Sequence, residues 1–195
     1  MLFTSDMMKL DKEDQKFLLK LARDSIRHYL SKGKILEIGP GGVPSKQLVE
    51  EGACFVTLHK NNELRGCIGT LEAHRPLFMD VIDNAVASAV GDPRFPALSL
   101  PELEHVTISI SVLTEPKDFP VKGPDDLLTK IIPNKHGLIL QHGLARATFL
   151  PVVWEQLPEK EVFLQHLSMK AGLSADGWRD PQTKFYVYEA IEFSE

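Results

Sequence analysis

The sequence predicts an α+β fold with a largely antiparallel sheet flanked by helices. Two observations predict it: pairs of β-prone runs are separated by turn residues, and the amphipathic helices do not alternate regularly with strands. The chain has 195 residues, enough to bury a substantial core, and a chain of this length is most often one domain. Its 43% hydrophobic and 25% charged residues are typical of a globular protein. We therefore expect residues 1–195 to form a single domain.

The charge of the chain argues against nucleic acid as a partner. The formal net charge is -5, and no run of Lys or Arg interrupts it, whereas phosphate binding depends on these residues. Residues 1–8 place no basic residue ahead of an apolar run, so no signal peptide is expected. No stretch is apolar for long enough to span a bilayer, so we expect a cytoplasmic protein that makes no membrane contact. Cys54 and Cys67 are too few for a disulfide scaffold, and both are expected to be reduced.

The first predicted element is a helix over residues 10–30. Its apolar residues recur at steps of three and four, Asp11 is a suitable N-cap, and Gly33 is a suitable stop. The glycine-rich segment 34–42 that follows is similar to the strand and loop of an S-adenosylmethionine-dependent methyltransferase. Val43 stands where that loop needs a third glycine, and Pro44 follows where a helix should begin. A short loop rich in glycine and proline is therefore expected here.

A hairpin and a helix are predicted next. The runs 53–59 and 63–71 flank Asn61 and Asn62, and asparagine tolerates the positive φ of a tight hairpin turn. Residues 75–91 have the apolar stripe of a helix, with a proline in its first turn. The remaining predicted elements are, in order, a strand over 106–113 with its Thr and Ser residues on one face, a short helix over 125–131, a hairpin of 137–141 with 145–150, a helix over 159–171 and a final strand over 185–193.

The segment Leu64-Arg65-Gly66-Cys67-Ile68-Gly69 carries the main candidate site. In a regular strand, Arg65 and Cys67 share one face, and a guanidinium beside a thiol stabilises its thiolate. Gly66 and Gly69 leave room for a substrate or another backbone to approach. The alternative is that Cys67 packs as a small apolar residue and that the glycines mark only a bulge or a tight crossing.

Cys54 and the histidines receive structural interpretations. With a turn at Asn61-Asn62, Cys54 is expected on the same face as Cys67 but displaced diagonally, too far for a disulfide, and it is interpreted as a core residue. No metal site is expected, because the chain has no Cys-x-x-Cys pair and no His-Glu-x-x-His helix. His136 and His142 would share a strand face, but two histidines do not make a metal site. No cofactor is expected.

The six-residue segment resembles the hallmark motif of the AMMECR domain family. The similarity covers nearly the whole chain in order, and two positions depart from it: the loop 39–42, and Ala97, where a second proline is common. The further segments that carry the resemblance are 52–58, 92–96, 109–113, 136–140, 147–151 and 170–173 with Trp178.

The resemblance implies a fold of two lobes with a cleft between them and the hexapeptide near the cleft. In microbial form the chain is similar to AmmeMemoRadiSam system protein A, which implies a Memo-like protein and a radical S-adenosylmethionine enzyme as partners. The family supplies no reaction. Matched by motif, the site contains Arg65, Gly66, Cys67 and Gly69, and its expected companions are Asp92, Arg94 and His136. The bland alternatives are that Asp92 and Arg94 cap the preceding helix and pair with each other, and that His136 only bonds to backbone.

Two functional hypotheses follow. The first is a thiol-dependent enzyme in which Cys67 is the nucleophile, Arg65 stabilises the thiolate or binds an anionic group, and His136 acts as general acid or base. The second is a non-catalytic binding or adaptor subunit that presents its cleft to partner proteins or to a small anionic ligand. Gly66, Gly69, Asp92 and Arg94 are the expected ligand-binding residues. A nucleotide site is a weaker third reading, in which Arg65 and Arg94 hold one phosphate.

Overall fold

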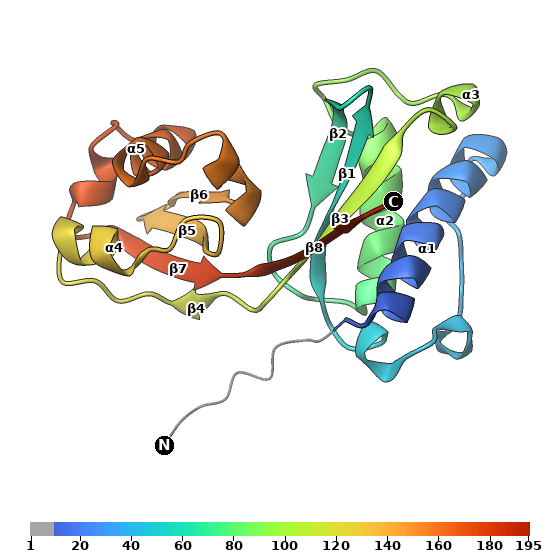
Figure 1. Cartoon of the computed structure of the whole chain (residues 1–195), viewed down its shortest axis with the longest axis horizontal. Helices are drawn as coiled ribbons and strands as arrows, with labels where there is room; N and C mark the ends of the chain where they lie inside the picture. Colours follow the sequence, from blue (N-terminus) through green and yellow to red (C-terminus); the bar gives the residue numbers. More distant parts are fainter. Residues whose placement is uncertain (1–9) are drawn as a thin grey trace. The chain divides into compact units, whose positions relative to one another are not determined.

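The computed structural model describes residues 10–195, and these divide into two compact units (Figure 1). The first unit comprises residues 10–114 and 191–195, and the second comprises residues 115–190. Each unit holds one four-stranded sheet, with the strand order β2-β1-β3-β8 in the first and β4-β7-β5-β6 in the second. Their paired strands run antiparallel, which confirms the predicted α+β fold.

The first helix, α1 (Lys12–Lys32), has the ends that the sequence predicts. The Asp11 carboxylate accepts hydrogen bonds from the backbone of Glu13 and Asp14, and the helix ends at Gly33, which adopts a φ of 67°. The following segment forms the expected loop rather than the strand of a methyltransferase. It contains only two short 3-10 turns, η1 (Pro40–Gly42) and η2 (Lys46–Leu48).

The sheet of the first unit contains β1 (Ala53–Lys60), β2 (Glu63–Gly69), β3 (Thr107–Leu113) and β8 (Ala190–Ser194). Asn61 and Asn62 both take positive φ, 53° and 63°, and close the predicted β1–β2 hairpin. Between β2 and β3 lie α2 (Leu77–Val90) and the single-turn helix α3 (Leu100–Leu103). Because β1 and β3 are the central strands, β2 forms one edge of this sheet.

The two faces of this sheet differ in chemistry. The face against α1 and α2 is apolar, and side chains such as Val56, Leu58 and Ile110 are completely buried there. The opposite face carries small polar side chains, because Thr57 on β1 stands directly opposite Ser109 on β3. The predicted division of the 106–113 strand into an apolar and a hydroxyl face is thus confirmed.

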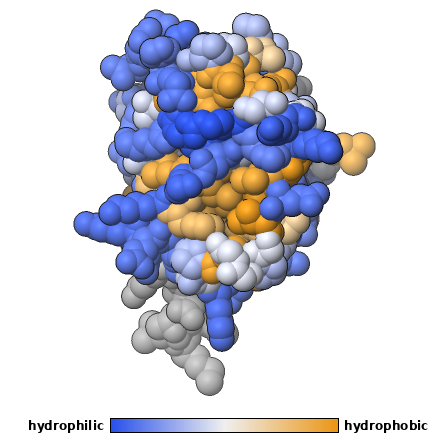
Figure 2. Space-filling view, turned by 90° about the vertical axis from the view of Figure 1, so that its right-hand side faces the viewer, coloured by the Kyte–Doolittle hydropathy of each residue, from blue (hydrophilic) through white to orange (hydrophobic). Residues whose placement is uncertain are grey.

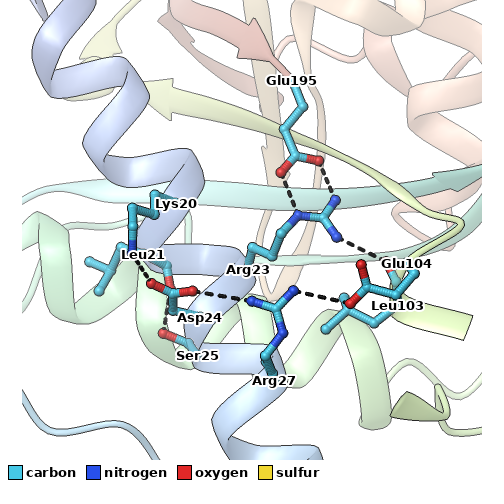
Figure 3. Close-up of polar contacts among 9 residues, drawn as sticks. All are labelled: Lys20, Leu21, Arg23, Asp24, Ser25, Arg27, Leu103, Glu104 and Glu195. Carbon is cyan, nitrogen blue, oxygen red and sulfur yellow. Dashed lines mark hydrogen bonds and ion pairs between the residues drawn. The ribbon is translucent and has the colours of Figure 1, made fainter. Parts of the chain in front are cut away.

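The end of the chain is fastened to α1 by Arg23 (Figure 3). Its guanidinium pairs with Glu195 and donates hydrogen bonds to the carbonyl oxygens of Leu103 and Val106, at 2.9 and 2.8 Å. Glu195 in turn accepts from the Ile108 amide at 3.0 Å. The surface seen in Figure 2 alternates hydrophobic areas with bands of hydrophilic residues.

The second unit packs its sheet around a separate aromatic core. Trp154 stacks on Phe163 with ring centroids 3.7 Å apart, and Trp178 is buried in the same cluster. The elements of this unit are β4 (Lys117–Asp118), α4 (Pro124–Lys130), β5 (Gly137–His142), β6 (Ala145–Phe149), η3 (Pro151–Glu155), α5 (Lys160–Lys170), η4 (Gly177–Arg179) and β7 (Lys184–Tyr188). Within residues 10–195, no helix is both long and apolar enough to cross a membrane.

One predicted element is wrong. The expected single strand over 185–193 is two strands, β7 and β8, which are separated at Glu189 and belong to different sheets. Both halves keep the alternation of a strand, so periodicity alone carries no sign that the chain leaves one sheet and enters another. The very short strand β4 and the helix α3 were not predicted either.

Candidate functional site

The candidate hexapeptide lies on edge strand β2, and its register changes in the middle of the motif. Gly66 pairs with Leu58 and Leu64 pairs with His59, so that Arg65 is an extra residue with no partner on β1. This arrangement is a β-bulge, and it shifts everything after Arg65 by one position relative to a regular hairpin.

The bulge overturns two expectations from simple alternation. Cys67 stands opposite Thr57 on the polar face, whereas Cys54 lies on the helix-covered face and is completely buried. The two cysteines therefore do not share a face, although the prediction that Cys54 is a core residue is confirmed. Burial raises the pKa of the Cys54 thiol well above its ordinary value, and the charge of Asp80 adds to the effect. Regular alternation would also place Leu64 and Gly66 on one face. The bulge separates them, because Leu64 stands opposite His59 and Gly66 stands opposite Leu58.

The two glycines of the motif are required by close packing. A Cβ on Gly66 would lie 2.1 Å from the carbonyl oxygen of Ser88 in α2, and a Cβ on Gly69 would lie 2.2 Å from the ring of Phe55. Gly66 thus lets β2 approach α2, which fixes the height of the strand over the helix. In this structure the room at both glycines is taken up by the protein itself rather than left open for a substrate.

Three side chains hold Cys67 in place. The Asp92 carboxylate accepts a hydrogen bond from the Cys67 amide at 2.9 Å, and Arg94 Nη2 lies 3.4 Å from the Cys67 carbonyl oxygen, to which it donates. The Thr57 hydroxyl donates to Cys67 Sγ at 3.2 Å. Cys67 itself is only partly buried. The backbone is therefore fixed from the open edge of the sheet, while the residue as a whole remains partly exposed.

Asp92 and Arg94 form an ion pair with unequal exposure. Arg94 Nε and Nη2 contact the two carboxylate oxygens at 3.0 and 2.7 Å, and the side chain of Asp92 is 2% exposed whereas that of Arg94 is 54% exposed. Hydrogen bonds from Arg94, and then from the Cys67 amide, hold the pKa of Asp92 well below its ordinary value despite burial. The pairing expected as the bland alternative is present, and the same carboxylate also anchors the motif.

Arg65 binds a carboxylate rather than the thiol. Its Nε and Nη2 donate to the two oxygens of Glu102 at 2.9 and 3.1 Å, and Lys60 Nζ lies 3.0 Å from the same carboxylate. These contacts, with Arg65 contributing most, lower the pKa of Glu102 to about 2. Arg65 Nη1 is buried and has no hydrogen-bond partner. The arginine that contacts Cys67 is therefore Arg94.

His136 belongs to the second unit, and its contacts are with residues of that unit. Its Nδ1 accepts from the Ile132 amide at 3.2 Å, its ring meets the edge of Phe119, and its carbonyl oxygen accepts from Trp154 Nε1 at 2.8 Å. Burial lowers the pKa of His136, which favours the neutral ring. The backbone contact is the alternative that the sequence offered, and a role in acid–base chemistry stays a prediction.

Sequence reasoning missed three residues of this site, namely Thr57, Lys60 and Glu102. Thr57 would have been found by placing the bulge at Arg65, since the shifted register alone sets it opposite Cys67. Glu102 lies on a single-turn helix 37 positions from Arg65, and no local pattern announces that pairing. No group of His, Cys, Asp and Glu side chains within residues 10–195 is arranged to hold a metal ion.

The comparison with known families confirms the family that the sequence resembles. The model of the AMMECR1 family matches residues 19–193, which includes both units and the whole candidate site. The chain belongs to the AMMECR1 family.

AMMECR1 relatives match the chain over almost its full length. Protein MK0488 of Methanopyrus kandleri is 41% identical, covering 96% of this chain and 91% of the relative. Protein MJ0810 of Methanocaldococcus jannaschii is 37% identical, covering 97% of this chain and 94% of the relative. The crystal structure of uncharacterized protein PH0010 from Pyrococcus horikoshii superposes with a TM-score of 0.88 at 37% identity, covering 95% of this chain and 93% of that one. None of these names assigns a reaction.

Proposed function

We propose that this AMMECR1 protein is a thiol-dependent enzyme in which Cys67 is the nucleophile. The observation that carries the proposal is the Thr57 hydroxyl, which donates a hydrogen bond to Cys67 Sγ at 3.2 Å. The thiolate is the reactive species of a cysteine, and this hydroxyl is placed to donate to the sulfur and to fix its position. Arg94 adds a positive charge nearby, and its pKa is raised chiefly by Asp92 and in small part by Cys67.

The fixed backbone around Cys67 supports the same proposal. A nucleophile works best when its position is set before the substrate arrives, because ordering it during the reaction costs rate. The buried carboxylate of Asp92, the hydroxyl of Thr57 and the close packing at Gly66 all act on this one residue or its neighbour. By contrast, Cys54 is sealed in the core and is unsuited to chemistry.

The proposed reaction is nucleophilic displacement at an electrophilic carbon. Cys67 loses its proton to solvent, and its Sγ electron pair forms a bond to the carbon while the bond to the displaced group breaks. The electron pair of the broken bond leaves with that group. Water then attacks the same carbon and loses a proton to solvent, and the S–C bond breaks with its electron pair returning to sulfur, which restores the thiolate. Every atom needed comes from the substrate, water and Cys67.

The test is the rate of alkylation by iodoacetamide at neutral pH, compared among variants. A Cys54→Ala background isolates Cys67, Thr57→Val removes the hydroxyl while keeping the shape, and Ser109→Ala is the matched control on the neighbouring strand. Hydrogen bonds to charged groups contribute about 1.5–3 kcal/mol, so Thr57→Val should slow the alkylation about tenfold or more. Ser109→Ala should leave the rate within about twofold.

An alkylation rate that equals that of a small free thiol and is unaffected by Thr57→Val would contradict the proposal. The non-catalytic subunit would then be favoured, with Memo-like and radical S-adenosylmethionine proteins as the partners to seek by pull-down. Cys67→Ala, which should abolish the labelling, confirms that the measured rate belongs to this residue.

A further inference from the structure

We infer that the Cys67 site takes a substrate that carries a carboxylate, and that Arg94 binds this group. The inference rests on the proposed thiol chemistry and adds the charge class of the substrate. The sequence suggested Arg65 for the anion, but the structure assigns that arginine to Glu102.

Arg94 has donors to spare on its exposed side. Its Nε and Nη2 are occupied by Asp92 and by the Cys67 carbonyl oxygen, whereas its Nη1 has no hydrogen-bond partner among residues 10–195. The side chain is 54% exposed, so the unused nitrogen can be reached from solvent. A carboxylate there would receive a charge-assisted hydrogen bond beside the nucleophile.

Arg94 is also held too firmly to swing away. Asp92 accepts hydrogen bonds from two nitrogens of its guanidinium and is itself held by a hydrogen bond from the Cys67 amide. The Arg94 guanidinium carbon lies 5.5 Å from the centre of the Phe95 ring. Asp92 does not compete for the position of a ligand, because its side chain is only 2% exposed and its oxygens point at Arg94 and the backbone. The guanidinium is therefore preorganised at a fixed place next to Cys67.

The charged side chains joined by these contacts leave an excess of positive charge. Three are cations, namely Lys60, Arg65 and Arg94, and two are carboxylates, Asp92 and Glu102. Arg65 also lies over the Phe95 ring, with its guanidinium carbon 5.9 Å from the ring centre. Its Nη1 is buried and has no hydrogen-bond partner. The ion pairs of these five side chains therefore leave one positive charge uncompensated, in a chain whose formal net charge is -5.

The test compares two alkylating agents that differ in charge. Iodoacetate and iodoacetamide both react by forming an S–C bond as the C–I bond breaks and iodide leaves. The ratio of their second-order rates with Cys67 cancels the fraction of thiolate and reports only the preference for the carboxylate. In the Cys54→Ala background, this ratio should be about tenfold higher than for a small free thiol such as N-acetylcysteine amide, as one charge-assisted contact implies.

Arg94→Gln should bring the ratio to within about twofold of the free-thiol value, and Arg94→Lys should retain part of the preference, because it keeps the charge without the forked donors. Arg27→Gln is the matched control: this arginine of α1 is 43% exposed and ion-paired, and it lies outside the site. Its loss should leave the ratio unchanged. A ratio that Arg94→Gln does not lower would overturn the inference.

A second measurement needs no variant and covers the case in which Arg94→Gln fails to fold. Acetate should protect Cys67 from iodoacetamide more strongly than acetamide does, and added salt should reduce that protection. Equal protection by the two compounds would reject the carboxylate site. Failure of the thiol proposal looks different, because the rate with iodoacetamide would match that of a free thiol and would not respond to Thr57→Val, while the preference for iodoacetate persisted.

Discussion

Replacing Gly66 by alanine tests whether the approach of β2 to α2 sets the geometry of the site. The added Cβ would lie 2.1 Å from the carbonyl oxygen of Ser88, whereas ordinary contact begins at 3.4 Å. The strand or the helix must therefore move by about 1.3 Å, and both are backbone elements of one core. Overpacking of this kind costs about 1–3 kcal/mol, which outweighs the gain of about 0.4–1 kcal/mol that alanine brings by restricting the unfolded chain. We expect a net loss of about 1–2 kcal/mol in the free energy of unfolding.

Urea unfolding followed by far-ultraviolet circular dichroism measures this loss. Tryptophan fluorescence is unsuitable, because Trp154 and Trp178 both lie in the second unit. Amide hydrogen exchange in peptides from β1, β2 and α2 locates the effect, which should appear there first. Gly41→Ala is the matched control, since its Cβ would meet nothing within 4 Å. A loss for Gly66→Ala below about 0.5 kcal/mol, or one equal to that of the control, would refute the argument.

Three further predictions concern the charges and the second cysteine. The pKa of Glu102 is depressed to about 2, so its contribution to stability is complete above the ordinary value near 4.5 and is lost as the pH falls through 2. In Glu102→Gln, the free energy of unfolding should therefore fall by about 2 kcal/mol less than in the unsubstituted protein between these two pH values. An equal fall in the two proteins would contradict this. Asp92→Asn should lower the free energy of unfolding by about 2–4 kcal/mol, measured in urea at neutral pH, and also speed exchange of the Cys67 amide; a stability change without faster exchange would separate Asp92 from the motif. In a Cys67→Ala variant, Cys54 should react with a thiol reagent no faster than the first unit unfolds, and rapid labelling in the absence of urea would show that the core opens locally.

The helices and hairpins could be predicted from the sequence because their signals are local. Asp11 and Gly33 cap α1 through contacts within a few residues, and Asn61 and Asn62 adopt the positive φ that the hairpin turn needs. The change of sheet at Glu189 could not be predicted, because it depends on which distant strands the two halves meet. Local periodicity describes the faces of a strand but not its partners.

The candidate site shows the same limit at the level of single residues. The family was predicted correctly from the segments that carry the resemblance. One extra residue at Arg65 nevertheless changed which side chains share a face with Cys67. A register shift of one position is invisible to alternation on a single strand. The Cys67 amide lies 25 positions from Asp92, and Glu102 lies 37 positions from Arg65, so these two contacts follow from the tertiary fold. The Asp92–Arg94 ion pair joins residues only two positions apart, and the sequence did offer it.

The division of the first unit into residues 10–114 and 191–195 bears on how the protein is made. A ribosome synthesises β8 after the whole of the second unit, so the sheet of the first unit lacks an edge strand throughout that interval. During this interval Arg23 lacks its ion-pair partner Glu195, and the backbone of β3 is unpaired on one side. The interval is the time needed to add about 80 residues, which is several seconds at cellular rates of elongation. The second unit, although it begins later, emerges with all of its strands in one continuous stretch. The second unit can therefore complete its sheet before the first unit does, although it begins later in the chain.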